Sequence, residues 1–482
     1  MNIWKKFAAI ALMAILFAAF QTGGAASAAQ GKELSMTEKK QLLREAADRH
    51  GIPAEILKAI ALEETAMMQF TKAGEPVIAA DGGIGIMQIT MSESELKAKG
   101  YDLEKLKVDT AYNIEAGAAI LAEKKKLSYL PVINGGDPNV IENWYFAIMA
   151  YNGASRVNDP NEPHAKAPYQ ERVLGNIDRF ALLPVYVPKN EKIDISYTNP
   201  DNPNLMSFPV RSYTWTKAAT PATQKLKAGS YAYTWNNQAD YTNIRSAADG
   251  NVVARVPHYS PVKIVSGPME TSNPNNLYVM YKIEGNGFSG FVSSSLLREK
   301  QVSVFKDIRN AEQASAAAFL QMRGIISGYP GNVFKPNEPI VRRHAAAMLV
   351  KALGLKLPEG YKMKAADMKP GDQNYQDMLI AEANGLFGGG GKLKPNEPLS
   401  RAQMASVLNR AYGAYYDPPT DKAVFKDIPI YFWNYSDINV LAHNKITVTE
   451  GEAFRPNESV TRAQFSLFMK RSIELKEAKA QD

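Results

Sequence analysis

The spacing of apolar residues changes along the chain and predicts different secondary structure in each region. Between residues 30 and 183 the apolar positions recur with a helical period. The first helix is expected to start at the capping-box sequence Ser35-Met36-Thr37-Glu38, and a second helix is expected to follow Pro53. Further helices are predicted at 109–127, 139–150 and 169–181. The pattern therefore predicts an α-helical domain over residues 30–183.

The next two regions lose this helical period. Residues 184–225 are rich in Pro, Asn, Thr and Tyr and are interpreted as a linker or an irregular extension. From 226 to 298, short alternating runs such as residues 252–256 are separated by Gly, Pro and Asn. Short strands at this spacing predict a small all-β barrel.

The C-terminal part of the chain is an internal repeat. A sequence built around Pro-Asn-Glu begins at Phe334, Leu393 and Phe454, so the copies are 59 and 61 residues apart. An Asp opens each unit, and these residues, 60 positions apart, are Asp307, Asp367 and Asp427. This period predicts three units that pack against one another, and their ranges are 301–360, 361–420 and 421–482.

The first 29 residues have the pattern of a secretory signal peptide. Lys5 and Lys6 precede an apolar run over residues 7–20, and small residues end in Ala26-Ser27-Ala28. Cleavage is expected after Ala28 or Ala29. A retained membrane anchor is the weaker alternative, because the run is short for the ~20 residues that span a bilayer. The mature chain is therefore expected to be exported and to have no membrane partner.

Composition narrows the class of protein only modestly. The chain has 482 residues, 45% of them apolar, and no cysteine, which excludes a disulfide-stapled scaffold. The 56 Lys and Arg against 49 Asp and Glu give a net charge of +7, which favours an anionic partner but not nucleic acid. Residues 301–482 contain 24 Lys and Arg against 19 Asp and Glu, so most of this charge lies in the repeats.

Glu64 is the candidate catalytic residue. It lies at the end of the second predicted helix, one turn beyond Ile60 and beside the apolar stripe, whereas Glu63 projects about 100° away. Apolar surroundings disfavour the charged form of a carboxyl group, which could then hold a proton for general acid catalysis. The alternative is an ordinary solvated Glu-Glu pair at a helix end.

Three further segments strengthen this assignment: Gly82-Gly83-Ile84-Gly85-Ile86-Met87-Gln88-Ile89, the run of residues 113–121 with Asn113 and Gly117, and Ala150-Tyr151-Asn152-Gly153-Ala154. With Glu64-Thr65 and in this order, they resemble the lysozyme-like domain of SLT-type lytic transglycosylases over about 150 residues. The resemblance implies that Glu64 is catalytic and that five residues bind substrate: Thr65, Met87, Gln88, Tyr151 and Asn152. It implies no metal and no cofactor.

The resemblance also implies the reaction. Glu64 would protonate the glycosidic oxygen between N-acetylmuramic acid and N-acetylglucosamine and then accept the proton of the C6 hydroxyl, leaving a 1,6-anhydro-muramyl end. A muramidase-type hydrolase is the rival, since ordinary glycosidases use two carboxylates. Asp81 and Glu63 are the candidates for a second one. A non-catalytic S-layer or cell-wall structural protein is the alternative from a different class, and retention of Glu64 with its partner residues argues against it.

The other two regions resemble known domains as well. Thr242-Asn243-Ile244-Arg245-Ser246 and the closing residues 290–297 resemble a bacterial SH3-like domain, which would be either a wall-peptide binder or a spacer. Each C-terminal unit resembles an S-layer homology (SLH) domain. Together these resemblances predict a multidomain chain with a helical lysozyme-like catalytic domain, a small all-β SH3-like barrel and an α-helical, trimer-like SLH repeat.

Three arginines at equivalent helix starts are candidates for binding an anionic sugar: Arg342, Arg401 and Arg462. Guanidinium groups beside unpaired helix N–H groups suit such a ligand. Ser400 and Thr461 can cap the helices that follow, whereas Val341 cannot. The resemblance to SLH domains implies non-covalent anchoring to an anionic, pyruvylated secondary cell-wall polymer, in a Gram-positive wall or S-layer, with the three arginines and Asp307, Asp367 and Asp427 at the binding grooves. Internal Arg-Asp salt bridges are the alternative.

Overall fold

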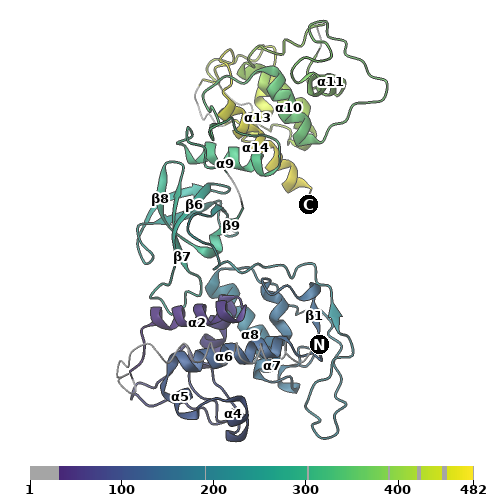
Figure 1. The fold of residues 1–482 in the computed structure, drawn as a ribbon. Coiled ribbons are helices and arrows are strands. Elements are labelled where there is room, and N and C mark those ends of the chain that lie inside the picture. The colour runs from purple at the N-terminus through teal and green to yellow at the C-terminus, as the bar shows by residue number, and fades with distance from the viewer. Residues whose placement is uncertain are drawn as a thin grey trace, which may run out of the picture. The chain divides into compact units, whose positions relative to one another are not determined.

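The computed structural model forms two compact units (Figure 1). The described residues are 32–189, 191–300, 303–388, 391–420, 425–447 and 453–480, and the predicted signal peptide at 1–29 lies outside them. The first unit takes the chain up to residue 222 together with 272–277, and the second takes 223–271 together with 278–482.

The first unit is helical, as predicted. Its helices are α2 (Met36–His50), α3 (Ala54–Thr65), α4 (Glu93–Lys99), α5 (Leu103–Val108), α6 (Thr110–Lys125), α7 (Tyr145–Asn152) and α8 (Tyr169–Asn176). A 3-10 turn, Ile141–Trp144, leads into α7, and a π turn, Ile177–Ala181, continues α8. The predicted capping box is confirmed, because Ser35 accepts the N–H of Glu38 and Glu38 accepts that of Ser35.

Helix α3 is the centre of this unit. Every residue from Ala54 to Ala61 is buried, including Glu55 and Lys58. Helices α2 and α8 pack against it. Neighbouring parts of the domain cover α3 along most of its length. Only its C-terminal end, where Glu63 and Glu64 lie, is partly exposed.

The segment after residue 183 packs as an extension on the helical core. Its buried apolar residues belong to the same core cluster as the helices, and they are Val185, Ile193, Met206, Phe208, Trp215 and Ala218. Strand β2 (Ser212–Tyr213) pairs in parallel with β1 (Val132–Ile133). The Asn134 side chain donates to the carbonyls of Trp215 and Ala218, which fixes the returning chain.

The second unit begins with a curled antiparallel sheet in the strand order β5-β4-β8-β7-β6-β3-β9. Its strands are β3 (Tyr231–Thr234), β4 (Tyr241–Arg245), β5 (Val252–Pro257), β6 (Pro261–Met269), β7 (Met280–Gly285), β8 (Phe288–Ser293) and β9 (Leu297–Glu299). Alternation places Val262, Ile264 and Ile283 in its small core.

Each repeat then contributes two helices. They are α9 (Ala311–Met322) and α10 (Arg342–Leu353), α11 (Tyr375–Ala383) and α12 (Arg401–Tyr412), and α13 (Tyr435–His443) and α14 (Arg462–Lys479). Ser400 and Thr461 form capping boxes at α12 and α14. Val341 makes no side-chain cap at α10, as its sequence predicts.

Backbone hydrogen bonds join the three repeats in a closed ring. The N–H of Ile340 donates to Val460 (2.9 Å), that of Val460 donates to Leu399 (2.8 Å), and that of Leu399 donates to Ile340 (3.0 Å). Each repeat therefore donates to one neighbour and accepts from the other. The packing of the repeats against one another is confirmed by their single shared apolar core.

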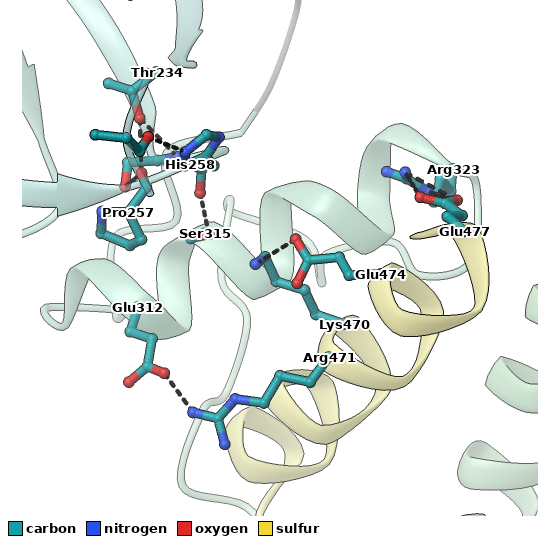
Figure 2. Close-up of polar contacts among 12 residues, drawn as sticks. Thr234, Pro257, His258, Glu312, Ser315, Arg323, Lys470, Arg471, Glu474 and Glu477 are labelled. Atoms are coloured by element: carbon teal, nitrogen blue, oxygen red, sulfur yellow. Dashed lines mark hydrogen bonds and ion pairs between the residues drawn. The ribbon is translucent and has the colours of Figure 1, made fainter. Parts of the chain in front are cut away.

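The sheet packs onto the first and last helices of the repeat region. Figure 2 shows the Ser315 hydroxyl of α9 donating to the carbonyl oxygen of His258, and Arg471 of α14 paired with Glu312 of α9 at 2.6 Å. The ring of Tyr259 contacts that of Phe319, with centroids 4.9 Å apart, and lies 5.7 Å from the Lys470 ammonium. Tyr259, in the turn between β5 and β6, thus lies beside both α9 and α14.

Candidate functional site

Glu64 is a half-buried carboxyl group at the C-terminal end of α3. The helix ends there because Ala66 and Met67 adopt left-handed backbone angles, with φ of 54° and 62°. The hydroxyl of Tyr169, on α8, donates to Glu64 Oε1 at 2.5 Å. Burial raises the pKa of Glu64 to about 7 against the opposing effect of this hydrogen bond, and the charge of Glu63 adds to the rise. Glu64 can therefore hold or release a proton near neutral pH.

The neighbouring carboxylate, Glu63, is bound by cationic and polar partners on α8. Arg172 Nε donates to Glu63 Oε1 at 2.6 Å, and Asn176 Nδ2 donates to Oε2 at 2.9 Å. Both oxygens of Glu63 are thus engaged. Asp81, the other candidate for a second carboxylate, is exposed, and its charge contributes to the raised pKa of Glu64.

The Gly-rich segment is held beside Glu64 by buried amide side chains. Met87 donates its N–H to Asn113 Oδ1 at 3.0 Å, and Ile86 donates to Gln69 Oε1 at 2.9 Å. The Met87 side chain is fully buried against Gly117, where an added Cβ would lie 2.7 Å from Met87 Cβ. The absence of a side chain at Gly117 therefore leaves room for Met87, whose side chain is part of the support for the site.

Three of the predicted substrate-binding residues are tied to the same segment. The Thr65 hydroxyl donates to the carbonyl of Ile86 at 3.3 Å, and the Tyr151 hydroxyl donates to that of Met87 at 2.8 Å. Burial, together with the charge of Glu64, raises the pKa of Tyr151 well above its ordinary value. Gln88 has a left-handed backbone, with φ of 47°, and donates to Gly85 at 2.8 Å.

Asn152 joins the site through a different contact. It is exposed at the end of α7, and its Oδ1 accepts a hydrogen bond from Asn158 Nδ2 at 3.0 Å. Asn158 Oδ1 in turn accepts the N–H of Tyr169 at 3.1 Å. Asn152 is therefore linked through Asn158 to the residue that contacts Glu64.

Sequence reasoning missed Tyr169 and Arg172. Both lie on the helix predicted at 169–181, and they reach the two carboxyl groups from more than 100 residues away in sequence. The available signal was the helical period of that segment, which predicts the element but not which side chains meet α3. Only the packing of α8 on α3 brings the four residues together.

In the repeats, the three opening aspartates each hold one turn of their own unit. Asp307 accepts the N–H groups of Phe334 (2.8 Å) and Lys335 (2.6 Å). The equivalent pairs of bonds run from Leu393 and Lys394 to Asp367, and from Phe454 and Arg455 to Asp427. Burial alone would raise the pKa of Asp367, but these N–H donors outweigh it and hold the pKa below its ordinary value.

The three arginines each reach into the next repeat. Arg342 Nε donates to the carbonyl of Leu393, and Arg401 Nε donates to that of Phe454, both at 2.6 Å. Arg462 closes the circle by donating to Ser327 of the first repeat at 3.0 Å. Burial lowers the pKa of all three. Within the described ranges, none of these arginines forms a salt bridge with the opening aspartates. The structure therefore does not contain the internal Arg-Asp pairs that were the alternative.

Neither a cluster of metal ligands nor a membrane-spanning helix is found among the described residues. Across the described part of the chain, no group of three or more His, Asp or Glu side chains is placed to hold a metal ion. No helix among the residues that the structure describes is long and apolar enough to cross a membrane.

Comparison with protein families identifies the class of the helical domain and of the three repeats. A model of the transglycosylase SLT domain matches residues 41–172, and a model of the S-layer homology domain matches 304–346, 366–405 and 424–466. The chain therefore contains a domain of the lytic-transglycosylase type followed by three SLH domains.

The chain is also similar to curated proteins over part of its length. The S-layer protein sap of Bacillus anthracis is 29% identical over 156 residues, which is 31% of this chain and 19% of that protein. A cell wall amidase described as uncharacterized, from the same organism, is 28% identical over 183 residues, 36% of this chain and 33% of that protein. An S-layer protein of Bacillus thuringiensis subsp. finitimus is 29% identical over 157 residues, 31% of this chain and 19% of that protein.

These matches span a third or less of each relative. With the three SLH domains, they indicate that the protein associates with the cell wall or S-layer.

Proposed function

We propose that the first unit is a lytic transglycosylase that cleaves the β-1,4 bond between N-acetylmuramic acid and N-acetylglucosamine and leaves 1,6-anhydro-muramyl ends. The observation that carries this proposal is the Glu64 carboxyl, whose burial raises its pKa to about 7 while its neighbour Glu63 is bound to Arg172. A pKa near the working pH suits one group that must act first as acid and then as base.

The proposed reaction uses one proton in a cycle. Glu64 gives its proton to the glycosidic oxygen as the bond to the anomeric carbon breaks. The carboxylate then takes the proton of the C6 hydroxyl while that oxygen attacks the anomeric carbon, so Glu64 ends protonated and no water is consumed. The Tyr169 hydroxyl, 2.5 Å from Oε1, stabilises the transient carboxylate. Gln88, Tyr151 and Asn152 are proposed to hydrogen-bond the sugar, with Thr65 and Met87 supporting the segment that carries Gln88.

A muramidase-type hydrolase is the second candidate, because Asp81 is close enough to Glu64 to affect its pKa. Mass spectrometry of products from purified wall separates the two outcomes, since a hydrolase leaves reducing muramic acid that is heavier by one water. Glu64→Gln should abolish release, and Glu63→Gln is the matched control, expected to retain the same product. Undiminished release by Glu64→Gln would contradict the assignment of Glu64, whereas no release by the parent protein itself would support a structural wall protein.

We further propose that the second unit is an SH3-like barrel followed by a trimer-like ring of SLH domains that anchors the protein in a Gram-positive wall. Arg342, Arg401 and Arg462 are proposed to bind an anionic, pyruvylated secondary polymer. This proposal is supported by the equivalent positions of the three arginines. Each lies at the start of a helix, and its guanidinium group donates a hydrogen bond to the next repeat. Asp307, Asp367 and Asp427 contribute by fixing the turn beside each groove.

Binding to wall sacculi, before and after chemical removal of the secondary polymer, tests the anchor. The intact protein should sediment with untreated sacculi and remain in solution with stripped ones. Equal sedimentation in both cases would overturn the polymer assignment without affecting the assignment of Glu64.

A further inference from the structure

A cavity of about 370 Å³ lies in the first unit, outside the residues assigned to the reaction. Its lining comes from residues 155–157, residues 162–164 and Asn204. The first two segments lie between α7 and α8, and the third belongs to the extension that follows the helices. None of these residues belongs to a motif that the sequence singled out.

The extension builds one wall of this cavity. Arg156 donates its N–H to the carbonyl of Asn204 at 3.0 Å, and Met206 donates to that of Ala154 at 2.9 Å. The Arg156 guanidinium lies 3.9 Å from the centre of the Tyr197 ring. The wall is therefore held by two backbone hydrogen bonds and one cation-π contact.

The cavity adjoins the reaction site through Asn158. This buried residue follows Val157 of the lining and donates to Asn152 Oδ1 at 3.0 Å. It also accepts the N–H of Tyr169, whose hydroxyl contacts Glu64. A sugar bound at Asn152 would thus lie next to the loop that lines the cavity.

The lining combines both charges with apolar surface. Arg156 and Glu162 form an ion pair at 3.2 Å in which both side chains are almost half exposed. Such a pair stabilises a protein little and opens at small cost. Val157 is 68% exposed, so an apolar side chain faces solvent at the same place. A short peptide carrying a carboxylate and an ammonium group suits Arg156, Glu162 and Val157 together. Arg156 would bind the carboxylate, Glu162 would bind the ammonium group, and an apolar side chain of the peptide would contact Val157.

We propose that this cavity binds the peptide stem carried by the glycan strand, and so selects peptide-bearing muramic acid next to the bond to be cut. The inference rests on the proposed function, because only a peptidoglycan substrate brings such a peptide to Asn152. A glycan strand without peptides offers no ammonium group to Glu162. If the cavity binds the peptide, peptide-bearing strands should therefore be cleaved more efficiently than strands without peptides.

The test compares cleavage of peptide-bearing strands with cleavage of the same strands stripped by an amidase. For the full chain, kcat/KM should be higher on peptide-bearing strands. Arg156→Ala should lower the ratio of the two kcat/KM values about tenfold, the loss expected for one hydrogen bond to a charged group. Arg156→Lys should recover part of the ratio, and Lys97→Ala, which removes an exposed cation on α4, should leave it unchanged. Acetylating the peptide amine should remove the effect of Glu162→Gln.

The outcomes are distinguishable. An unchanged ratio in Arg156→Ala, or an equal loss on both substrates, overturns the peptide assignment while Glu64→Gln still tests the reaction. Loss of the ratio together with an unchanged melting temperature supports it. Activity of Glu64→Gln equal to that of the parent would contradict the proposed function itself.

Discussion

Glu64 and Asp367 show how one functional group is put to two uses in the same chain. Both are partly buried carboxyls, and burial acts on both in the same direction. Asp367 accepts two backbone N–H groups and keeps a lowered pKa, whereas Glu64 has one hydroxyl donor and a pKa raised to about 7. Fixed N–H donors turn a buried carboxylate into part of the scaffold, and their absence leaves a group that exchanges protons.

The largest expected effect is on Glu64, the member of this pair that is proposed to be catalytic. Glu64→Gln keeps the shape of the side chain and removes its proton, so the rate of anhydro-muropeptide release should fall by about 10²-fold or more. Asp367→Asn should leave this rate unchanged. A comparable loss of release in both variants would show that the two carboxyls do not differ in role.

The pH dependence of cleavage sharpens the comparison. The acid form of Glu64 is needed to start the reaction, so kcat/KM should fall as pH rises through about 7. Tyr169→Phe removes the hydrogen bond that lowers this pKa and should move the falling limb to higher pH while reducing the rate. If the fall of kcat/KM with pH occurs at the same pH in Tyr169→Phe, then the titrating group that causes it is not Glu64.

Stability should respond to the structural carboxylate. Asp367→Ala leaves the N–H groups of Leu393 and Lys394 without their acceptor, so the free energy of unfolding should fall by about 1–3 kcal/mol. Urea denaturation of the full chain, followed in the second unit, measures this. Glu359→Ala, at an exposed position, is the control. Equal midpoints for the two variants would remove the structural role of Asp367.

Removing the buried charge of Glu64 should also change the free energy of unfolding. Here the substitution should stabilise the protein, whereas Asp367→Ala should destabilise it. The folded pKa of Glu64 is raised above the unfolded value, so the folded state loses stability relative to the unfolded state as pH rises from about 4.5 to about 7. Glu64→Gln should therefore be more stable than the parent above pH 7, with the advantage fading toward pH 4. Thermal unfolding of both proteins across this range checks it, and an advantage that does not depend on pH would count against the raised pKa.

The smallest expected effect concerns the helix start that lacks a cap. Val341→Thr can supply the hydroxyl that Ser400 and Thr461 provide in the other repeats, and should stabilise the second unit by about 1 kcal/mol. Val341→Ala serves as the control without a hydroxyl. If both variants are stabilised equally, the gain comes from helix propensity and not from a capping hydrogen bond.

The sequence predicted elements better than it predicted contacts. Helical periodicity located α6, α7 and α8, and the repeat period located three units whose helices share one core. Glu64 was recognisable because the motif and the apolar stripe lie next to it in sequence. Tyr169 and Arg172 were not, because no local pattern says which face of α8 meets α3. The sequence did not predict that the aspartate oxygens bind backbone N–H groups of their own repeats, because these bonds depend on the folded turn. Their place at the polymer grooves stays a prediction.

The ring of repeats has a mechanical consequence for a protein held at a wall. The chain enters the ring through α9, so tension arriving from the sheet acts first on that helix. Two ion pairs, Arg471 with Glu312 and Arg323 with Glu477, tie α9 to α14, the last helix of the ring. Each repeat is also bound to both of its neighbours by the backbone hydrogen bonds of the ring. In the proposed anchor, separating one repeat from the others would therefore require breaking its bonds to two neighbours at once.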